Sequence, residues 1–203
     1  MKVIDLTVLL NEDTPVYPGD PKTIIKPAGV LEKDGYADHQ ITLSTHVGTH
    51  IDAPAHMVLG GETLDKIPTE QFMGRGVYIK LDAKKFDLKK LEVAGITKGD
   101  IVIFDTGLAG DYHKQSYFED YPQIPNDVAQ FLIDKKVNMV GMDMCSPDHE
   151  PFEIHKVLLS GGVLIIENLT NLVKLNGETF EIIALPLNLE IDGSPARVIA
   201  RTM

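Results

Sequence analysis

The residues best suited to chemistry lie within eleven consecutive positions. The segment from 46 to 56 holds three histidines and one aspartate: His46, His50, Asp52 and His56. Imidazole nitrogens combined with a carboxylate oxygen favour zinc, manganese or ferrous iron, whereas calcium and magnesium prefer oxygen ligands throughout. A lone histidine is usually a hydrogen-bonding loop residue, but three beside an aspartate are better explained by a metal. We therefore expect His46, His50 and Asp52 to bind a divalent ion.

The spacing of these residues argues against a helix. On a helix Asp52 would lie about 200° around the axis from His50, and Gly48 and a run of β-branched residues also disfavour that conformation. In an extended chain, positions 46, 50, 52 and 56 have the same parity and point to one face. A straight strand would still separate His46 from Asp52 by about 20 Å, too far to share one ion. The prediction is therefore a strand that bends at Gly48, where glycine allows unusual dihedrals.

His56 follows Pro54 and lies a few residues beyond the expected ligands, so we expect it near the ion without being bound to it. Water bound to such an ion has a pKa of about 7 and is a ready nucleophile. A nearby imidazole can deliver a proton to the leaving group. We therefore interpret the segment as the centre of a metal-dependent hydrolase, with His56 as the proton-transferring residue.

A second set of candidate ligands lies far along the chain. Glu167 ends an apolar run, where a buried unpaired carboxylate would be costly and would need a cation. His155 lies on an expected helix before that run, and an antiparallel return would bring the two together. With Asp52 they could bind a second ion about 3.5–4 Å from the first. Spacing alone equally allows Glu167 to be an exposed residue without a metal. It also leaves His149 as a candidate ligand in place of His155.

Two aspartates follow another buried run. Asp143 and Asp148 are candidates to accept hydrogen bonds from ligand histidines, although turn or cap residues would look the same. The remaining histidines, His39 and His113, are expected at the surface.

The elements that must position these residues are mostly strands. We expect strands at 2–10, 40–45, 76–81, 100–105, 137–143, 163–167, 180–187 and 196–201, and helices at 125–136 and 152–159. No repeat of 20 to 50 residues is present. The pattern predicts a single α/β domain over residues 1–203, with mixed β-sheets and few helices.

Composition narrows the class of partner. With 19 Lys+Arg and 30 Asp+Glu the net charge is −11, which disfavours nucleic acid and anionic lipid and favours a small-molecule substrate. The single cysteine, Cys145, excludes an internal disulfide and suits a reducing compartment. The amino terminus has no signal-peptide pattern, and no apolar run reaches the length of a membrane span. We expect a cytoplasmic protein.

At these residues the sequence resembles the cyclase family of metal-dependent hydrolases, which includes bacterial kynurenine formamidases and isatin hydrolases. The family signature, His-x-Gly-Thr-His-x-Asp-x-Pro-x-His, is met at every position from His46 to His56. Further matching features extend the resemblance over most of the chain: the Tyr17 to Asp20 loop, the segment 141–148, and His155 with Glu167 twelve residues later.

The resemblance implies a centre with two zinc ions, with manganese as the alternative metal, and a fold of the swivelling β/β/α type. The implied ligands share Asp52: His46, His50 and Asp52 for one ion, and Asp52, His155 and Glu167 for the other. His56 would be the catalytic acid and base. A homodimer or higher homo-oligomer is also implied, with pockets that a neighbouring subunit could complete. Tyr17 stands where kynurenine formamidases usually carry tryptophan, and it could stack on an aryl ring.

The leading prediction is hydrolysis of a non-peptide C–N bond, converting N-formylkynurenine to kynurenine and formate in tryptophan catabolism. Family alternatives are the opening of a cyclic amide of the isatin type and a cyclase or dehydratase reaction. The residues also allow a ferrous oxygenase that uses two histidines and one carboxylate, which leaves His46 and Glu167 without a role. A metal-stabilised binding module would instead need a site closed by four protein ligands.

Overall fold

The structure is a computed structural model that describes residues 1–203. Its strands and helices follow one another along the chain in this order: β1 (Val3–Asp5), β2 (Ile24–Gly29), α1 (Leu31–Asp34), β3 (Asp38–Thr42), β4 (His50–Asp52), β5 (Met73–Lys80), α2 (Leu88–Val93), β6 (Ile101–Asp105), α3 (Asn126–Lys135), β7 (Met139–Met142), α4 (Glu153–Ser160), β8 (Leu164–Glu167), β9 (Phe180–Pro186) and β10 (Gly193–Thr202). None of the helices combines the length and apolar character that crossing a bilayer requires.

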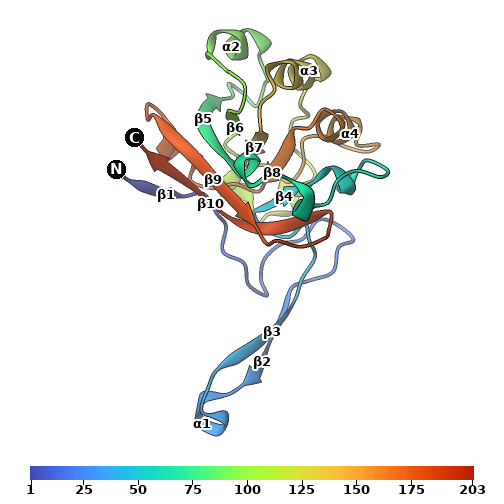
Figure 1. Ribbon diagram of the computed structural model, residues 1–203, viewed down its shortest axis with the longest axis vertical. Coiled ribbons are helices and arrows are strands. Elements are labelled where there is room, and N and C mark those ends of the chain that lie inside the picture. Colours follow the sequence, from blue (N-terminus) through green and yellow to red (C-terminus); the bar gives the residue numbers. More distant parts are fainter.

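Most of the strands form one closed sheet. The hydrogen-bonded order is β10-β4-β8-β7-β6-β5-β9, and β9 pairs again with β10, while β1 lies beside β10. Strands β5 to β8 run parallel, and the other pairs in the barrel are antiparallel. Each parallel connection carries one helix, and Figure 1 shows α2, α3 and α4 in a row along one side of the sheet. The expectation of an α/β domain with mixed strands and few helices is confirmed.

Alternating side chains divide the interior into two cores. In β6, Ile101 and Ile103 point into the barrel, whereas Val102 and Phe104 pack toward the helices. This is the two-residue period of a strand whose two faces are both buried. The helices close the outer core with apolar side chains from α3 and α4, such as Leu132 and Leu158. A polar side chain that points outward from these strands therefore lies beneath the layer of helices.

Several expected elements need correction. The strand expected at 2–10 ends at Asp5, because farther along the backbone N–H of Val8 donates to the hydroxyl of Thr49 instead of to a neighbouring strand. The strand expected at 40–45 lies at Asp38–Thr42. Its partner β2 was not predicted, since Pro27 interrupts the strand pattern there.

The bend expected at Gly48 is present. Gly48 has a φ of +65°, and the chain turns there before strand β4 begins at His50. A left-handed φ favours glycine because it has no Cβ to clash with the backbone. His46 consequently lies before the strand, not within it, and the turn folds it back toward Asp52.

The parallel pair β5–β6 is fastened by one buried carboxylate. Asp100, which is 3% exposed, accepts hydrogen bonds from Arg75 Nε at 2.9 Å and from the backbone N–H of Thr97 at 2.7 Å. Burial alone would raise the pKa of Asp100, but the bonds from Arg75 and Thr97 outweigh it and lower the pKa. The ionised carboxylate thus holds the start of β6 against β5.

We predict that Asp100→Asn lowers the free energy of unfolding by about 1–2 kcal/mol at neutral pH, because it weakens charge-assisted bonds that are partly screened on the Arg75 side. Because the pKa of Asp100 is lower in the folded protein, its ionised carboxylate stabilises the fold at pH values above the unfolded-state pKa of about 3.9. This contribution disappears as the pH falls through the folded-state pKa. Urea unfolding of both proteins at neutral pH and at about pH 3 measures the difference, which should shrink in acid.

Asp82→Asn is the matched control, since Asp82 pairs with Lys90 in an exposed ion pair. Such pairs contribute little. A constant difference for Asp100→Asn at both pH values would contradict the assignment.

Candidate functional site

The candidate residues meet on the outward face of β4 and β8, beneath α4. His50 lies directly opposite Glu167 in the antiparallel register of these two strands. Ile51 and Ile166 point into the barrel, so His50, Asp52 and Glu167 point outward. His155 comes down from the first turns of α4. All four site residues are at most 5% exposed.

The turn at Gly48 also fixes the orientation of His50. The Nδ1 atom of His50 lies 2.8 Å from the carbonyl oxygen of Gly48, to which it donates. The same carbonyl accepts from Nδ2 of Asn168 at 3.0 Å. With Nδ1 committed to this carbonyl, the ring of His50 directs Nε2 toward Asp52 and Glu167, which is the orientation that a metal-binding histidine requires.

Asp148 does the same for His155. One carboxylate oxygen accepts from the backbone N–H of Ile154 at 2.6 Å, at the start of α4. The other lies 2.5 Å from Nδ1 of His155. Asp148 is fully buried, so it fixes both the helix and the imidazole, and Nε2 of His155 is left facing the carboxylates.

The facing atoms have the separations expected of ligands around one ion. Four donors at about 2.1 Å from a tetrahedral ion are about 3.4 Å apart. His50 Nε2 lies 3.3 Å from Asp52 Oδ1 and 3.5 Å from Glu167 Oε2, and His155 Nε2 lies 3.3 Å from Glu167 Oε1 and 3.9 Å from Asp52 Oδ2. Oδ2 of Asp52 is buried without a hydrogen-bond partner. A buried orphan oxygen among such donors fits a divalent cation.

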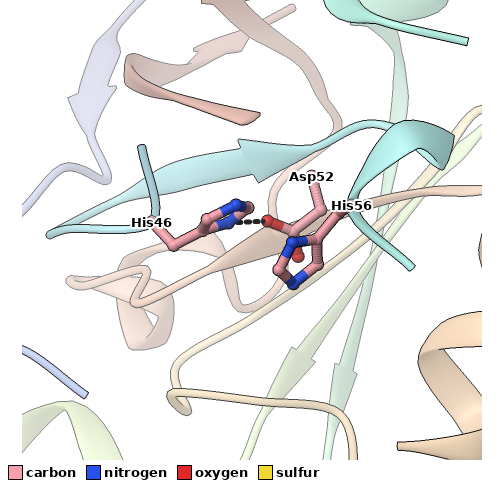
Figure 2. Close-up of side chains that lie close together, drawn as sticks. All are labelled: His46, Asp52 and His56. Carbon is pink, nitrogen blue, oxygen red and sulfur yellow. Dashed lines mark hydrogen bonds and ion pairs between the residues drawn. The ribbon is translucent and has the colours of Figure 1, made fainter. Parts of the chain in front are cut away.

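His46 and His56 form a second layer at the open side of Asp52 (Figure 2). Nδ1 of His46 lies 2.7 Å from Asp52 Oδ1, and its Nε2 lies 2.9 Å from Oδ2 of Asp192. The ring of His56 lies against that of His46, with centroids 3.9 Å apart. One nitrogen each from His46 and His56 and one oxygen of Asp52 lie within 4.8 Å of one another. These residues are therefore close enough to serve the same ion or the same substrate.

The carboxylates govern the protonation of the cluster. Burial alone would lower the pKa of His46, but the charges of Asp52 and Asp192 outweigh it and raise the pKa to about 9. Burial also raises the pKa of Glu167, and the adjacent charge of Asp52 adds to the effect. Two buried carboxylates side by side are costly unless cations compensate them. The site therefore favours positive charge.

His56 differs from the other histidines of the site. Burial lowers its pKa, and the neighbouring His46 and His155 oppose its protonation further. An imidazole with a lowered pKa is neutral at pH 7 and free to accept a proton.

These side chains line a cavity of about 240 Å³ that is open to the surface. Tyr17 and Phe152 give it aromatic walls, and Cys145 and Ser146 also lie on its lining. Tyr17 comes from the turn in which the N–H of Asp20 donates to the Tyr17 carbonyl at 3.0 Å. The cavity volume lies just below the usual range for small-molecule pockets.

The positions of the remaining candidate residues in the structure decide between the roles that the sequence allowed for them. Asp143 was expected to support a histidine, but its carboxylate accepts from Thr106 and from the N–H of Ala109, so that prediction is wrong. Asp143 instead holds the loop after β6. His149 stacks on Tyr121 at 4.1 Å and lies outside the cavity, which removes it as a competing ligand. Both His39 and His113 are exposed.

Two residues of the site were not predicted. Asp192 lies in the turn between β9 and β10, 146 positions from His46, and only the closure of the barrel brings it there. Phe152 precedes α4 with a φ of +59°, which turns its ring toward His155. The Asp-Gly pair at 192–193 signals a turn but not its proximity to the histidines. A Cβ on Gly193 would lie 2.5 Å from His46 Cε1, so this turn must approach closely.

Comparison with known proteins gives related sequences and structures. A family model described as "Putative cyclase" matches residues 4–149. An uncharacterized protein of Methanocaldococcus jannaschii is 38% identical over 207 residues, covering 98% of this chain and 99% of its own. A kynurenine formamidase of Bacillus cereus is 31% identical over 205 residues, covering 98% of this chain and 96% of its own.

Solved structures share the fold. Isatin hydrolase A from Labrenzia aggregata, bound to benzyl benzoate, has a TM-score of 0.84 at 26% identity, covering 98% of this chain and 93% of its own. A structure described as a potential metal-dependent hydrolase with cyclase activity has a TM-score of 0.76 at 33% identity, covering 98% and 96%.

We predict that Zn²⁺ or Mn²⁺ raises the unfolding temperature of the protein and that Asp52→Asn removes most of this effect, because Asp52 faces both His50 and His155. An ion at 100 times its dissociation constant stabilises a folded protein by about 2.7 kcal/mol. Scanning calorimetry with chelator and with added metal measures the gain. Asp82→Asn, at an exposed ion pair, should gain as much as the wild type. An equal gain in Asp52→Asn would show that the ion binds elsewhere.

Proposed function

Because this chain belongs to the cyclase family, we propose that it is a metal-dependent hydrolase of a non-peptide amide bond, with N-formylkynurenine as the leading substrate. The observation that carries the proposal is the buried cluster of His50, Asp52, His155 and Glu167 at the base of an open cavity. The names of related proteins, kynurenine formamidase and isatin hydrolase, both describe hydrolysis of a small aromatic amide.

A divalent metal is part of the proposal. His50, Asp52, His155 and Glu167 would hold it, with His46 close enough to complete a second position beside Asp52. Imidazole and carboxylate ligands suit zinc first and manganese second, and we propose two ions per chain that share Asp52. Bound there, the metal would supply Lewis acidity that polarises a substrate carbonyl.

His56 is the residue that we assign to proton transfer. It is half-buried on the cavity wall, neutral at pH 7, and has no role in holding the buried cluster. A neutral imidazole can take a proton from an attacking water and return it to the departing nitrogen. Asp192 Oδ2 lies 3.6 Å from Nδ1 of His56, so its charge can steady the imidazolium between these two events.

Tyr17 and Phe152 support an aryl substrate. Their rings line the same cavity as His56, and aromatic rings favour stacked or edge-to-face contacts with another ring. Tyr17 is held by an edge contact with Phe118, with centroids 6.3 Å apart. An arylformamide could therefore place its ring between these walls and its formyl group over the carboxylates.

The alternative of opening a cyclic amide is favoured by the likeness to an isatin hydrolase structure. A cyclase or dehydratase reaction would use the same polarised carbonyl. The ferrous oxygenase alternative would leave Glu167 unused, although it lies 3.3 Å from His155. A closed structural metal site is disfavoured by the open cavity above the ligands. The small-molecule partner, the homo-oligomeric state and the cytoplasmic location stay predictions.

We predict that the metal-loaded protein releases formate from N-formylkynurenine and that His56→Ala lowers kcat by about 10²- to 10⁴-fold, since general acid–base catalysis contributes that much. His113→Ala is the control, because His113 is an exposed histidine that does not line the cavity. Formate release measures the reaction, and metal analysis checks that both variants are loaded. An active His56→Ala enzyme would remove its assigned role, and a protein that opens isatin but not the formamide would establish the alternative.

Asp192→Asn is expected to lower kcat about tenfold with little change in KM, because the loss of a supporting carboxylate typically costs 10- to 100-fold. Steady-state kinetics separates the two constants. Glu190→Gln, two residues away and exposed, should behave as the wild type. Unchanged kinetics in Asp192→Asn would mean that its contact with His46 and His56 does not serve the reaction.

A further inference from the structure

Asn168 follows Glu167 at the end of strand β8, and its side chain reaches back to the turn before β4. The residue is 6% exposed and has a φ of +57°, a left-handed conformation that asparagine adopts more readily than most residues. Strand β8 ends there, so the paired register of β4 and β8 stops at His50 and Glu167. The turn at Gly48 lies just beyond this last pair and needs another connection to β8.

Two side-chain hydrogen bonds supply that connection. Nδ2 of Asn168 donates to the carbonyl oxygen of Gly48 at 3.0 Å. The hydroxyl of Thr49 donates to the carbonyl oxygen of Asn168 at 2.7 Å, and it accepts from the N–H of Val8 at 3.0 Å. Gly48, Thr49 and Asn168 are all buried. Asn168 therefore fastens both residues that immediately precede His50.

The carbonyl of Gly48 is the group that most needs to be held. Glycine has more conformational freedom than any other residue, so the peptide group that follows it in a turn is weakly constrained. This carbonyl also accepts from Nδ1 of His50 at 2.8 Å, the bond that directs Nε2 toward Asp52 and Glu167. Rotation of the peptide group would remove the partner of the imidazole. The bond from Asn168 opposes that rotation, and both lone pairs of the carbonyl oxygen are then used.

The hydroxyl of Tyr117 decides which end of the Asn168 amide faces Gly48. It donates to Oδ1 of Asn168 at 2.8 Å, and Tyr117 is 1% exposed. An asparagine side chain accepts at its oxygen and donates at its nitrogen, so holding the oxygen turns the nitrogen toward the carbonyl. The ring of Tyr117 is itself held by edge contacts with Tyr112 and Phe118, with centroids 5.3 and 5.1 Å apart. The hydroxyl therefore has a fixed position.

We propose that Asn168 and Tyr117 are positioning residues of the metal centre, which act through the Gly48 carbonyl to hold His50 in the orientation that binds the ion. The inference rests on the proposed function, because it requires a metal at His50. Neither Asn168 nor Tyr117 lines the cavity, so their effect on the ion must pass through His50. Loss of a group that orients a ligand histidine typically costs about 10- to 100-fold in metal affinity or activity.

The test is the Zn²⁺ affinity of two variants, measured by competition titration against a chromophoric chelator without any substrate. Asn168→Gly tolerates the left-handed backbone and removes the bond to Gly48, and we expect at least one Zn²⁺ binding step to weaken about 10- to 100-fold. Tyr117→Phe keeps the ring and loses the hydroxyl. It should weaken the same step by a smaller factor, because the amide can still reach the carbonyl. The tyrosine variant decides the question if Asn168→Gly does not fold.

The chain offers a matched control for each variant. Asn171 also has a left-handed φ, of +60°, and its Nδ2 donates to a backbone carbonyl, that of Asp5, at 2.9 Å. Asn171→Gly should lower the urea midpoint in the presence of chelator, as Asn168→Gly does, but leave the Zn²⁺ affinity unchanged. Tyr78→Phe loses a hydroxyl that is hydrogen-bonded to a carboxylate outside the cavity, and it is the control for Tyr117→Phe.

A second readout is the visible absorption of the Co²⁺-loaded protein, which reports the geometry of the ligands. We expect Asn168→Gly to change this spectrum and Asn171→Gly to keep that of the wild type. Wild-type Zn²⁺ affinity in both Asn168→Gly and Tyr117→Phe, or equal weakening in Asn171→Gly, would overturn the positioning role. A wild-type protein that binds no Zn²⁺ would overturn the metal centre and this inference together, whereas the measured affinities decide the inference whichever amide the enzyme hydrolyses.

Discussion

The buried carboxylate of Asp52 is the interaction on which the site depends. It lies on a strand of three residues, between His46 on one side and His50 and His155 on the other. Burial would raise the pKa of Asp52, but the charges of His50 and His46 outweigh it and hold the pKa well below its ordinary value. One oxygen still has no hydrogen-bond partner. Burying such a group is costly unless a cation completes it, and this links the fold to metal chemistry.

The barrel supplies the rigidity that this arrangement needs. Alternation along β4 and β8 points isoleucines inward and the side chains of His50, Asp52 and Glu167 outward, so the strands that build the inner core also orient the site. The outer helix layer then adds His155 and excludes water from the buried half of the cluster. The far nitrogens of His50 and His155 donate hydrogen bonds to the carbonyl of Gly48 and the carboxylate of Asp148, so both imidazoles are oriented before any ligand arrives. Only the face that carries His56 is open to a substrate.

Much of this could be predicted where the signal is local. Three features depend on neighbouring residues alone: the shared parity of the site residues from 46 to 56, the bend at Gly48, and the apolar runs that form β6, β7 and β8. Asp192 could not be found in this way, because only the pairing of β10 with β4 brings its turn to His46. Asp143 was misassigned since an aspartate after a strand looks the same whether it holds a histidine or a loop. Strand β2 was not predicted because Pro27 interrupts its strand pattern, whereas its partner β3 overlaps the expected strand at 40–45.

The central claim is that a divalent ion binds to Asp52 together with the oriented nitrogens of His50 or His155. A crystal structure of the protein grown with Zn²⁺, with anomalous data collected at the zinc absorption edge, tests it most directly. The account predicts a peak about 2.0–2.2 Å from an oxygen of Asp52 and from Nε2 of at least one of these histidines. A fully loaded crystal with its anomalous peaks elsewhere, and none at Asp52, would contradict it.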